Sequence, residues 1–476
     1  MRRRRKDQRG VALLLVMSSI ALLTITLVEF QEEQTSDLQS AYAERDALVA
    51  EYMARSGMNL SRLFIAAEPT MRNSLGILKL MFKGGNVPQL PVWEFSDVIL
   101  GAFSDKAGQK GFGDLGGFDL SKTKHLGGPE GARFTVTVVD EDSKINANLG
   151  ARGNVIAENR FGQAFLGLTA SPAYDALFQR NDRDGNTTDR ETMCGAIMDW
   201  ADPDEILYPC QPFNFQGGGA AAGGEDQSTQ LLPKPYRVKN AAYDSLDELR
   251  LVRGVGDDFW ATFVDPDPSS PKKRVLTVWG QGPLNVNTAS PQAVLGVLCG
   301  LAHDSVICTD PMKSQSFLSM FGVLRTFTAG MPLFGSPMEF VTTAQGGGNY
   351  GKLLFDTLKI PPVKFQSPAE AAKNFTTESK VFSIYATGEV DGPHRTTRVK
   401  LHVVVDFRGA PGIPDMLGAN GQPAGASSAP GSPPGAPTTA PTTSPTSTLP
   451  GGLTPDALAA ALAVSPEGAI VHYRVE

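Results

Sequence analysis

The chain opens with a long hydrophobic run that follows a cluster of charged residues. Residues 11–28 (VALLLVMSSIALLTITLV) carry no charge, and a helix of that length spans about 27 Å, which is enough to cross the apolar core of a membrane. Six basic residues precede the run, which favours a cytoplasmic start and an exported remainder. The pattern then becomes amphipathic, so we expect one helix to about Leu63, with Leu48, Tyr52, Leu60 and Phe64 available to pack.

Alternation of apolar and polar residues predicts strands in widely separated places. The first is FTVTVV at 134–139. Two more, at 380–390 and 395–407, are joined by a turn that contains Gly and Pro, which predicts a hairpin, and a last candidate lies at 469–475. Pieces this small are not stable separately, so we expect one antiparallel sheet packed on the amphipathic half of the first helix.

A long, mostly helical segment interrupts these strands, which predicts an α+β domain with a large inserted helical domain. A segment rich in Pro, Gly, Ser and Thr reads as a linker, and Thr454 and Pro455 favour a short helix after it. The expected divisions are a leader at 1–10, a transmembrane and packing helix at 11–63, the first part of the α+β domain at 64–149, the inserted domain at 150–373, the β-hairpin at 374–408, the linker at 409–452, and a short helix with the last strand at 453–476.

A glycine separates the basic residues from the hydrophobic run. A secretory signal peptide ends with small residues before a cleavage point, and nothing of this kind follows the run. Gly10 and Val11 resemble instead the cleavage point of a prepilin, where the peptidase cuts after the glycine, the apolar helix stays on the mature protein and the new N-terminus is methylated. The alternative is a plain signal anchor in which Gly10 is incidental.

Leu15 stands where prepilins usually carry glutamate, the fifth residue of the mature chain. In that class the glutamate faces the free amino group of a neighbouring subunit, and this pairing offsets the cost of burying both charges in lipid. A subunit with leucine offers no carboxylate to the subunit above it. It therefore suits the end of a filament better than the middle.

Composition and charge agree with an exported, folded chain. Its 476 residues are 41% hydrophobic, enough for two or three modest cores. Removing residues 1–10 takes the formal net charge from −7 to −12, and so acidic a chain is a poor nucleic-acid binder. Four cysteines, Cys194, Cys210, Cys299 and Cys308, form two close pairs in the sequence, which predicts two disulfides in an oxidising periplasm. Other pairings and four free thiols remain alternatives.

Carboxylates gather around the first cysteine pair. They are Asp199, Asp202, Asp204, Glu205, Glu225 and Asp226. Oxygen ligands in this number suit calcium, and without a cation the like charges would repel one another, so we expect a calcium site. The alternative is a solvated acidic surface. A second group, Asp182, Asp184, Asn186 and Asp189, imitates the start of an EF-hand loop, but Gly185 comes too early and Met193 replaces the last glutamate, so only a looser calcium loop is left.

Several short segments make a family resemblance specific. They are KINAN at 144–148, IMDWAD at 197–202, YRVKNA at 236–241, DSLDELRLVRG at 244–254, LNVNTA at 284–289 and VHYR at 471–474. Together with the leader and the helical insertion, they resemble K-type minor pseudopilins of the type II secretion system (general secretion pathway protein K). The resemblance covers the chain from Gly10 to the end, except the linker. It implies a pilin-like fold and calcium in the inserted domain.

The resemblance implies a structural subunit in the bacterial inner membrane, with its globular part in the periplasm. It would join I-type and J-type minor pseudopilins at the tip of the pseudopilus, start its assembly, and support protein export across the outer membrane. Implied partners are these proteins, other pseudopilus subunits and the prepilin peptidase, with no nucleic acid or small-molecule substrate. The first alternative is a minor pilin of a type IV pilus.

Two other patterns bear on function. Residues 249–259 (LRLVRGVGDDF) resemble a helix-hairpin-helix, whose glycine turn presents N–H groups to DNA phosphate, but Asp257 and Asp258 follow the turn and would repel it. We therefore expect a tight turn at Gly254 and Gly256, and a membrane-anchored DNA-binding protein is the less favoured alternative. Asparagines at 146, 148, 285 and 287 lie ahead of predicted helices, where we expect them to cap backbone N–H groups.

Nothing in the sequence argues for an enzyme. The five histidines are scattered, and no HExxH, CxxC or GxSxG accompanies them. His402 and His472 lie in predicted strands, so we expect half-buried sheet residues rather than a catalytic base.

Overall fold

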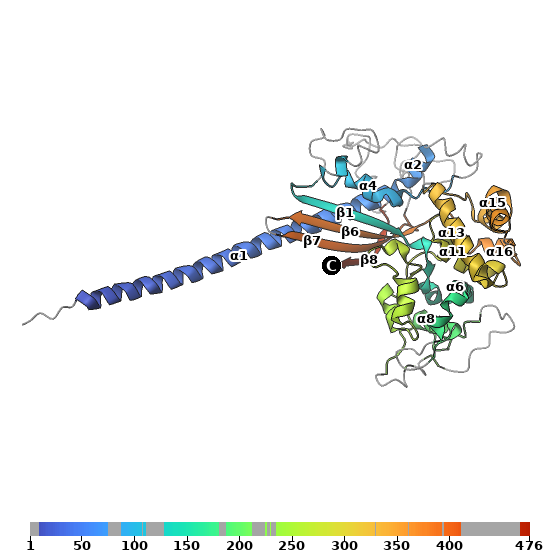
Figure 1. The fold of residues 1–476 in the computed structure, drawn as a ribbon, viewed down its shortest axis with the longest axis horizontal. Helices are drawn as coiled ribbons and strands as arrows, with labels where there is room; N and C mark the ends of the chain where they lie inside the picture. Colours follow the sequence, from blue (N-terminus) through green and yellow to red (C-terminus); the bar gives the residue numbers. More distant parts are fainter. Residues whose placement is uncertain are drawn as a thin grey trace, which may run out of the picture.

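The fold is described here from a computed structural model of the chain (Figure 1). The structure describes residues 9–74, 87–106, 108–110, 128–179, 187–211, 224–225, 229, 235–328, 330–359, 361–392, 395–410 and 467–476. Most of the predicted leader and linker, the predicted helix after the linker, Asp226 and the first three members of the EF-hand-like group lie outside the described residues.

Helix α1 (Arg9–Ala66) projects from the body of the molecule (Figure 1). Its first half contains an 18-residue window of mean hydropathy 2.6 with none of it buried, so α1 is long and apolar enough to cross a membrane. Its second half packs on the sheet through small and flexible residues, among them Ala50, Met53 and Ala54. Of the four residues expected to be available for packing, Leu60 and Phe64 pack against this cluster, whereas Leu48 and Tyr52 are 55% and 59% exposed and do not contact the sheet.

Four strands form one antiparallel sheet, in the order β1-β6-β7-β8. They are β1 (Ala132–Asp140), β6 (Val381–Asp391), β7 (Thr396–Asp406) and β8 (Ala469–Val475). Alternate residues of the strands point toward α1, where Phe134, Phe382 and Val403 join the helix and Trp93 in one buried cluster. The predicted hairpin and the return of the last strand to the same sheet are confirmed, as is the α+β fold class.

The chain between β1 and β6 makes the inserted, mainly helical part. Its longer helices are α6 (Val155–Thr169), α8 (Arg190–Ala201), α11 (Pro291–Leu301), α13 (Pro311–Phe327), α14 (Pro337–Ala344) and α15 (Gly348–Leu358). Short ones are α7 (Asp175–Phe178), α10 (Asp257–Phe259), α12 (Val306–Thr309) and α16 (Pro368–Ala372). Before β1 come α2 (Glu68–Ser74) and α4 (Ser96–Gly101). Two parallel ladders, β2 (Ile145–Asn146) with β3 (Leu276–Thr277) and β4 (Leu284–Asn285) with β5 (Phe375–Thr376), complete the insert.

Buried acidic residues at the end of β1 fasten the insert to the sheet. The Asp142 carboxylate accepts hydrogen bonds from the main-chain N–H groups of Gln281, Lys380 and Val381. The Asp140 carboxylate accepts hydrogen bonds from the hydroxyls of Thr288, which follows β4, and Ser379, which follows β5. Burial raises the pKa of Asp140 to about 8. The two ends of the insertion therefore meet at one hydrogen-bonded junction, which no sequence pattern indicated.

The asparagine-containing segments of the sequence serve the fold. Asn146 caps the turn that follows β2 by accepting from the N–H of Asn148, as predicted. Asn148 and Asn287 instead bridge distant loops: Asn148 bonds the main chain of Tyr243, and Asn287 accepts from two consecutive N–H groups at 333–334. These two therefore cap backbone N–H groups as predicted, but the groups lie in distant loops and not in a following helix.

The predicted tight turn near residue 254 is present between a 3-10 helix (Leu246–Leu251) and α10. Gly254 supplies its left-handed residue, with φ of 84°, a value that L side chains rarely adopt. Gly256 has ordinary extended geometry, with φ of −88°.

Candidate metal centre

Helix α8 presents the first two acidic residues of the predicted site. Asp189 caps its start by accepting a hydrogen bond from the N–H of Thr192, which explains that member of the EF-hand-like group. Asp199 lies in the last turn, and Asp202 is the C-cap, with its N–H bonded to the Met198 carbonyl. The three-residue spacing brings both carboxylates to the C-terminal end of the helix.

A disulfide returns the following loop to the same helix. Cys194 on α8 is bonded to Cys210, with their Cα atoms 5.9 Å apart. Within this loop the N–H of Tyr208 donates to Asp199 Oδ1 at 2.7 Å. The second disulfide, Cys299–Cys308, joins α11 to α12. Both predicted pairings are confirmed.

Three predicted carboxylates converge. Asp199, Asp202 and Glu225 are 3%, 4% and 5% exposed, and a carboxylate oxygen from each lies within 4.8 Å of the others. Among the described residues, Asp202 Oδ1 and both oxygens of Glu225 have no hydrogen-bond partner. Burying carboxylate oxygens without hydrogen-bond donors is unfavourable in free energy. A cation bound between them would offset this cost.

The electrostatics of the cluster lead to the same conclusion. Burial raises the pKa of Asp199 to about 8, of Asp202 to about 7 and of Glu225 to about 8, and the neighbouring carboxylates add to each rise. A bound cation reverses this preference, because its charge favours the ionised form of each ligand. Hard oxygen donors of this kind fit calcium.

The remaining predicted ligands do not join this group. Asp204 and Glu205 are exposed, and Asp204 Oδ1 accepts from the N–H of Ile206 in its own loop, 2.8 Å away. Both lie outside the buried group, although the charge of Asp204 is near enough to help raise the pKa of Asp199, Asp202 and Glu225. Cation binding by Asp204 and Glu205 stays a prediction. Asp226 lies outside the described residues.

Sequence analysis missed one neighbour of the cluster. Asn240 belongs to the segment YRVKNA, and its Nδ2 donates to the main-chain oxygen of Asp204. Its side-chain oxygen is buried and has no partner among the described residues. Only proximity in the folded chain reveals it, because more than thirty residues separate Asn240 from α8 in the sequence.

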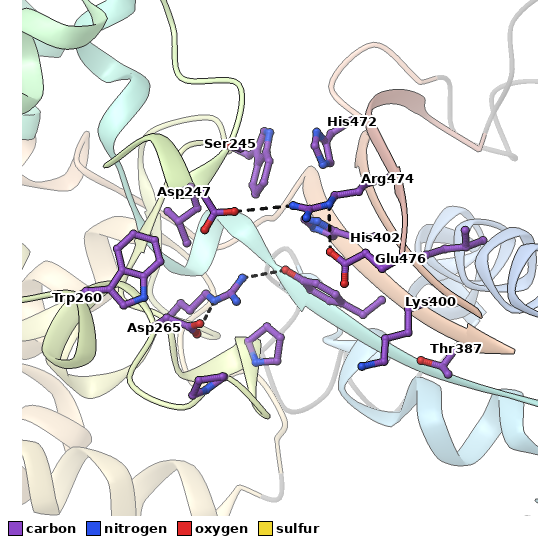
Figure 2. A pocket seen from close by; sticks show the side chains of 17 residues that line it. Ser245, Asp247, Trp260, Asp265, Thr387, Lys400, His402, His472, Arg474 and Glu476 are labelled. Atoms are coloured by element: carbon purple, nitrogen blue, oxygen red, sulfur yellow. Dashed lines mark hydrogen bonds and ion pairs between the residues drawn. The ribbon is translucent and has the colours of Figure 1, made fainter. Parts of the chain in front are cut away.

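The histidines of the sheet line a cavity of about 270 Å³ between the sheet and the insert (Figure 2). His402 stacks on Tyr385 with ring centroids 4.3 Å apart, and Trp279 of the insert contacts both His402 and His472. Burial lowers the pKa of His402 to about 4, so it is neutral at ordinary pH. Arg474 reaches Asp247 across the cavity, 3.8 Å away. Both histidines are half-buried sheet residues, as expected.

The similarity of this chain to known proteins lies in its structure. No family model matches the chain, and no curated protein matches it. Among solved structures, it is similar to a chain of the crystal structure of the GspK-GspI-GspJ complex from the enterotoxigenic Escherichia coli type 2 secretion system. The sequence identity is 12% and the TM-score is 0.42, over 78% of this chain and 94% of that chain. At this level we transfer no residue role from it.

Proposed function

We propose that this chain is a K-type minor pseudopilin of a type II secretion system. It joins I-type and J-type minor pseudopilins at the tip of the pseudopilus, starts its assembly and supports protein export across the outer membrane. The prepilin peptidase removes residues 1–10, and Val11 becomes the methylated N-terminus. The body then lies in the periplasm and α1 in the inner membrane.

One observation carries this proposal. Beyond the membrane-length run, α1 keeps a row of exposed large apolar residues on the face turned away from the sheet: Leu38, Leu48, Tyr52 and Leu63, each 47% to 59% exposed. Their successive sequence spacings of 10, 4 and 11 residues place them on one side of a helix. In water such a row favours contact with another apolar helix, so we expect partner helices to pack along it.

The location of the insert supports a place for this subunit at the tip of the pseudopilus. The insert lies at the end of the body farthest from the start of α1 (Figure 1). A subunit stacked above would meet this bulk. Leu15 in place of glutamate adds a chemical reason, because the chain offers no carboxylate to a subunit above it.

The proposal includes calcium at Asp199, Asp202 and Glu225. Calcium would supply the positive charge that these buried carboxylates lack. The three residues then hold the loop closed by Cys194–Cys210 and the segment around Glu225 against the end of α8. The metal in this proposal is structural.

Copurification with I-type and J-type partners tests the proposal. The double variant Leu48→Asp with Tyr52→Asp should lose most of the partner bound by the full chain, since it places charges in the apolar row. Met312→Asp is the matched control, because Met312 is 77% exposed on α13 and lies outside the row. Equal partner recovery from both variants would contradict the proposal.

Three further results separate the alternatives. Mass spectrometry of the mature protein should give a start at Val11, whereas an intact basic segment would exclude processing as a prepilin. Loss of secretion without loss of surface fibres in a deletion strain distinguishes a pseudopilin from a minor pilin of a type IV pilus. A salt-dependent DNA shift with the purified chain would instead favour the DNA-binding alternative.

A further inference from the structure

The last strand leaves one edge of the sheet open. In the described sheet, β8 ends the order β1-β6-β7-β8 and pairs only with β7. Lys400 and Glu476 exchange both of their main-chain hydrogen bonds, so by antiparallel alternation the N–H and C=O groups of Tyr473 and Val475 point away from β7. Within the part of the chain that the structure describes, these outward groups have no hydrogen-bond partner. The edge can therefore accept a further strand.

The opposite edge of the sheet is protected. There the Ser104 hydroxyl accepts a hydrogen bond from the N–H of Phe134 in β1 and donates one to its carbonyl oxygen, both at 2.7 Å. Helix α4 lies against the same strand. Folded proteins usually cover or charge an exposed edge, which prevents pairing with other chains. Among the described residues this holds at β1 but not at β8, where Val471, Tyr473 and Val475 are 42% to 55% exposed.

Helix α1 holds β8 in place and extends the surface beside it. Arg62 donates hydrogen bonds to the main-chain oxygens of residues 467–468, just before the strand, at 3.0 and 2.9 Å. The Arg55 guanidinium lies over the Tyr52 ring, 5.9 Å from its centroid, and also reaches Tyr473, whose side-chain hydrogen bond raises the pKa of Arg55. The open edge is therefore continuous with the apolar row of α1 along which we expect partner helices to pack.

The two faces of β8 define the chemistry of a matching strand. Tyr473 and Val475 lie opposite residues of β7 that pack on α1, so their side chains are on the helix side of the sheet. His472 and Arg474 are on the other side, where they line the cavity beside the insert (Figure 2). A matching strand therefore alternates apolar residues toward the α1 side with polar residues toward the insert.

A second copy of this chain fits the edge poorly. Two copies joined by antiparallel pairing of β8 would be related by a twofold axis perpendicular to the strands. Because α1 runs along the strands (Figure 1), the two helices would point in opposite directions and could not enter one membrane together. A different subunit with a similar helix and sheet can offer a strand of either direction, since an antiparallel sheet contains both.

We propose that β8 is a docking edge for a partner subunit of pilin-like fold, which adds a strand to this sheet while its own apolar helix packs along α1. The inference rests on the proposed function and specifies which part of the periplasmic body contacts the partner. Main-chain hydrogen bonds supply the affinity in strand addition of this kind, and the alternating side chains supply the specificity.

Tyr473→Pro and Tyr473→Ala form a matched pair of variants. Both remove the ring, but only proline removes the outward N–H. Proline is tolerated on an edge strand where that N–H faces solvent, so pairing with β7 should remain. In titrations with the I-type and J-type partners in detergent, we expect the proline variant to bind about tenfold more weakly than the alanine variant. Denaturation midpoints check that both variants fold, and equal affinities of two folded variants would overturn the proposal.

Hydrogen exchange at single-residue resolution tests the edge in the unmodified chain. In the complex, the amides of Tyr473 and Val475 should exchange about tenfold more slowly than in the free chain, or slower still. The amide of Arg474 faces β7 and should exchange slowly in both states. Unchanged exchange at the two outward amides would contradict the docking edge while partner binding leaves the proposed function intact. Failure to bind either partner would instead overturn the proposed function.

A self-association measurement covers the remaining occupant. Sedimentation of the unmodified chain without partners should show no dimer that depends on the edge. A homodimer that Tyr473→Pro abolishes and Tyr473→Ala keeps would assign β8 to a second copy and overturn the proposal.

Discussion

Two side chains at the junction between sheet and insert, Asp140 and His402, should change the free energy of unfolding with pH in opposite directions. Burial raises the pKa of Asp140 and lowers that of His402, since each group avoids its charged form. Asp140 therefore contributes stability that is fully present below its unfolded pKa of 3.8 and is lost as pH rises from there to about 8. His402 contributes stability that is present above its unfolded pKa of 6.5 and is lost as pH falls toward 4.

Replacing His402 should remove this acid sensitivity. Between pH 8 and pH 5 we expect the unmodified chain to lose roughly 2 kcal/mol of unfolding free energy relative to His402→Gln, because only the unfolded state then binds a proton at residue 402. Denaturant titrations at both pH values measure the difference, and Asp140 cancels because both proteins contain it. His303→Gln, at a side chain 56% exposed, is the control and should follow the unmodified chain. If the unfolding free energies of His402→Gln and the unmodified chain change equally between the two pH values, the prediction is wrong.

The candidate site was predictable where it depended on local spacing. Asp199 and Asp202 lie three residues apart at a helix end, so proximity in sequence became proximity in space. Asp204 and Glu205 are as close in sequence, but the chain has left the helix and Asp204 bonds the N–H of its own loop. Asn240 depends on how a distant segment folds back, and no periodic pattern records that.

The contact between α1 and the sheet depends on small residues. A methyl group on Gly388 of β6 would overlap the Ala50 carbonyl and crowd the N–H of Ala54. Large apolar residues usually mark the buried face of a helix, and Leu48 and Tyr52 were among the residues expected to be available for packing. Here Ala50, Ala54 and Gly388 allow a close approach, and the large residues remain outside.

Gly388→Ala should therefore separate α1 from the sheet. We expect a loss of roughly 3 kcal/mol or more in unfolding free energy, because main-chain atoms of a packed helix cannot move aside cheaply. Gly322→Ala in α13 is the matched control, because no atom lies within 4 Å of the added methyl group. It should be neutral or stabilise by up to about 1 kcal/mol, as alanine favours a helix. Equal denaturation midpoints for the two variants would contradict this account.

Strand pairing was more predictable than the interior of the insert. Regular alternation marked β1, β6, β7 and β8, and only one sheet could use them all. The insert instead depends on two-residue ladders and on asparagine amides that bridge loops far apart in sequence. Such contacts leave no periodic signal, so the sequence predicted that the segment is helical and not how its pieces pack.

At the scale of the whole molecule, the described residues form two separate hydrophobic clusters. One joins α1 to the sheet around Phe134, Phe382 and Trp93. The other fills the insert and includes Phe161, Ile197 and the rest of its buried residues. The acidic residues after β1 and the rings around Trp279 connect the two. Each cluster is large enough to define a unit that unfolds cooperatively.

Calcium should therefore act on one unit only. Because Asp199, Asp202 and Glu225 all belong to the insert, calorimetry of the full chain in detergent should resolve two transitions, of which calcium raises only that of the insert. At a free concentration of 100 times the dissociation constant the gain is about 2.7 kcal/mol. In a Trp93→Phe background the remaining tryptophans, Trp200, Trp260 and Trp279, all belong to the cluster of the insert or pack against it, so their emission assigns the transition. Asp199→Asn with Asp202→Asn should abolish the shift. A single transition that moves as a whole would show instead that the junction couples sheet and insert into one cooperative unit.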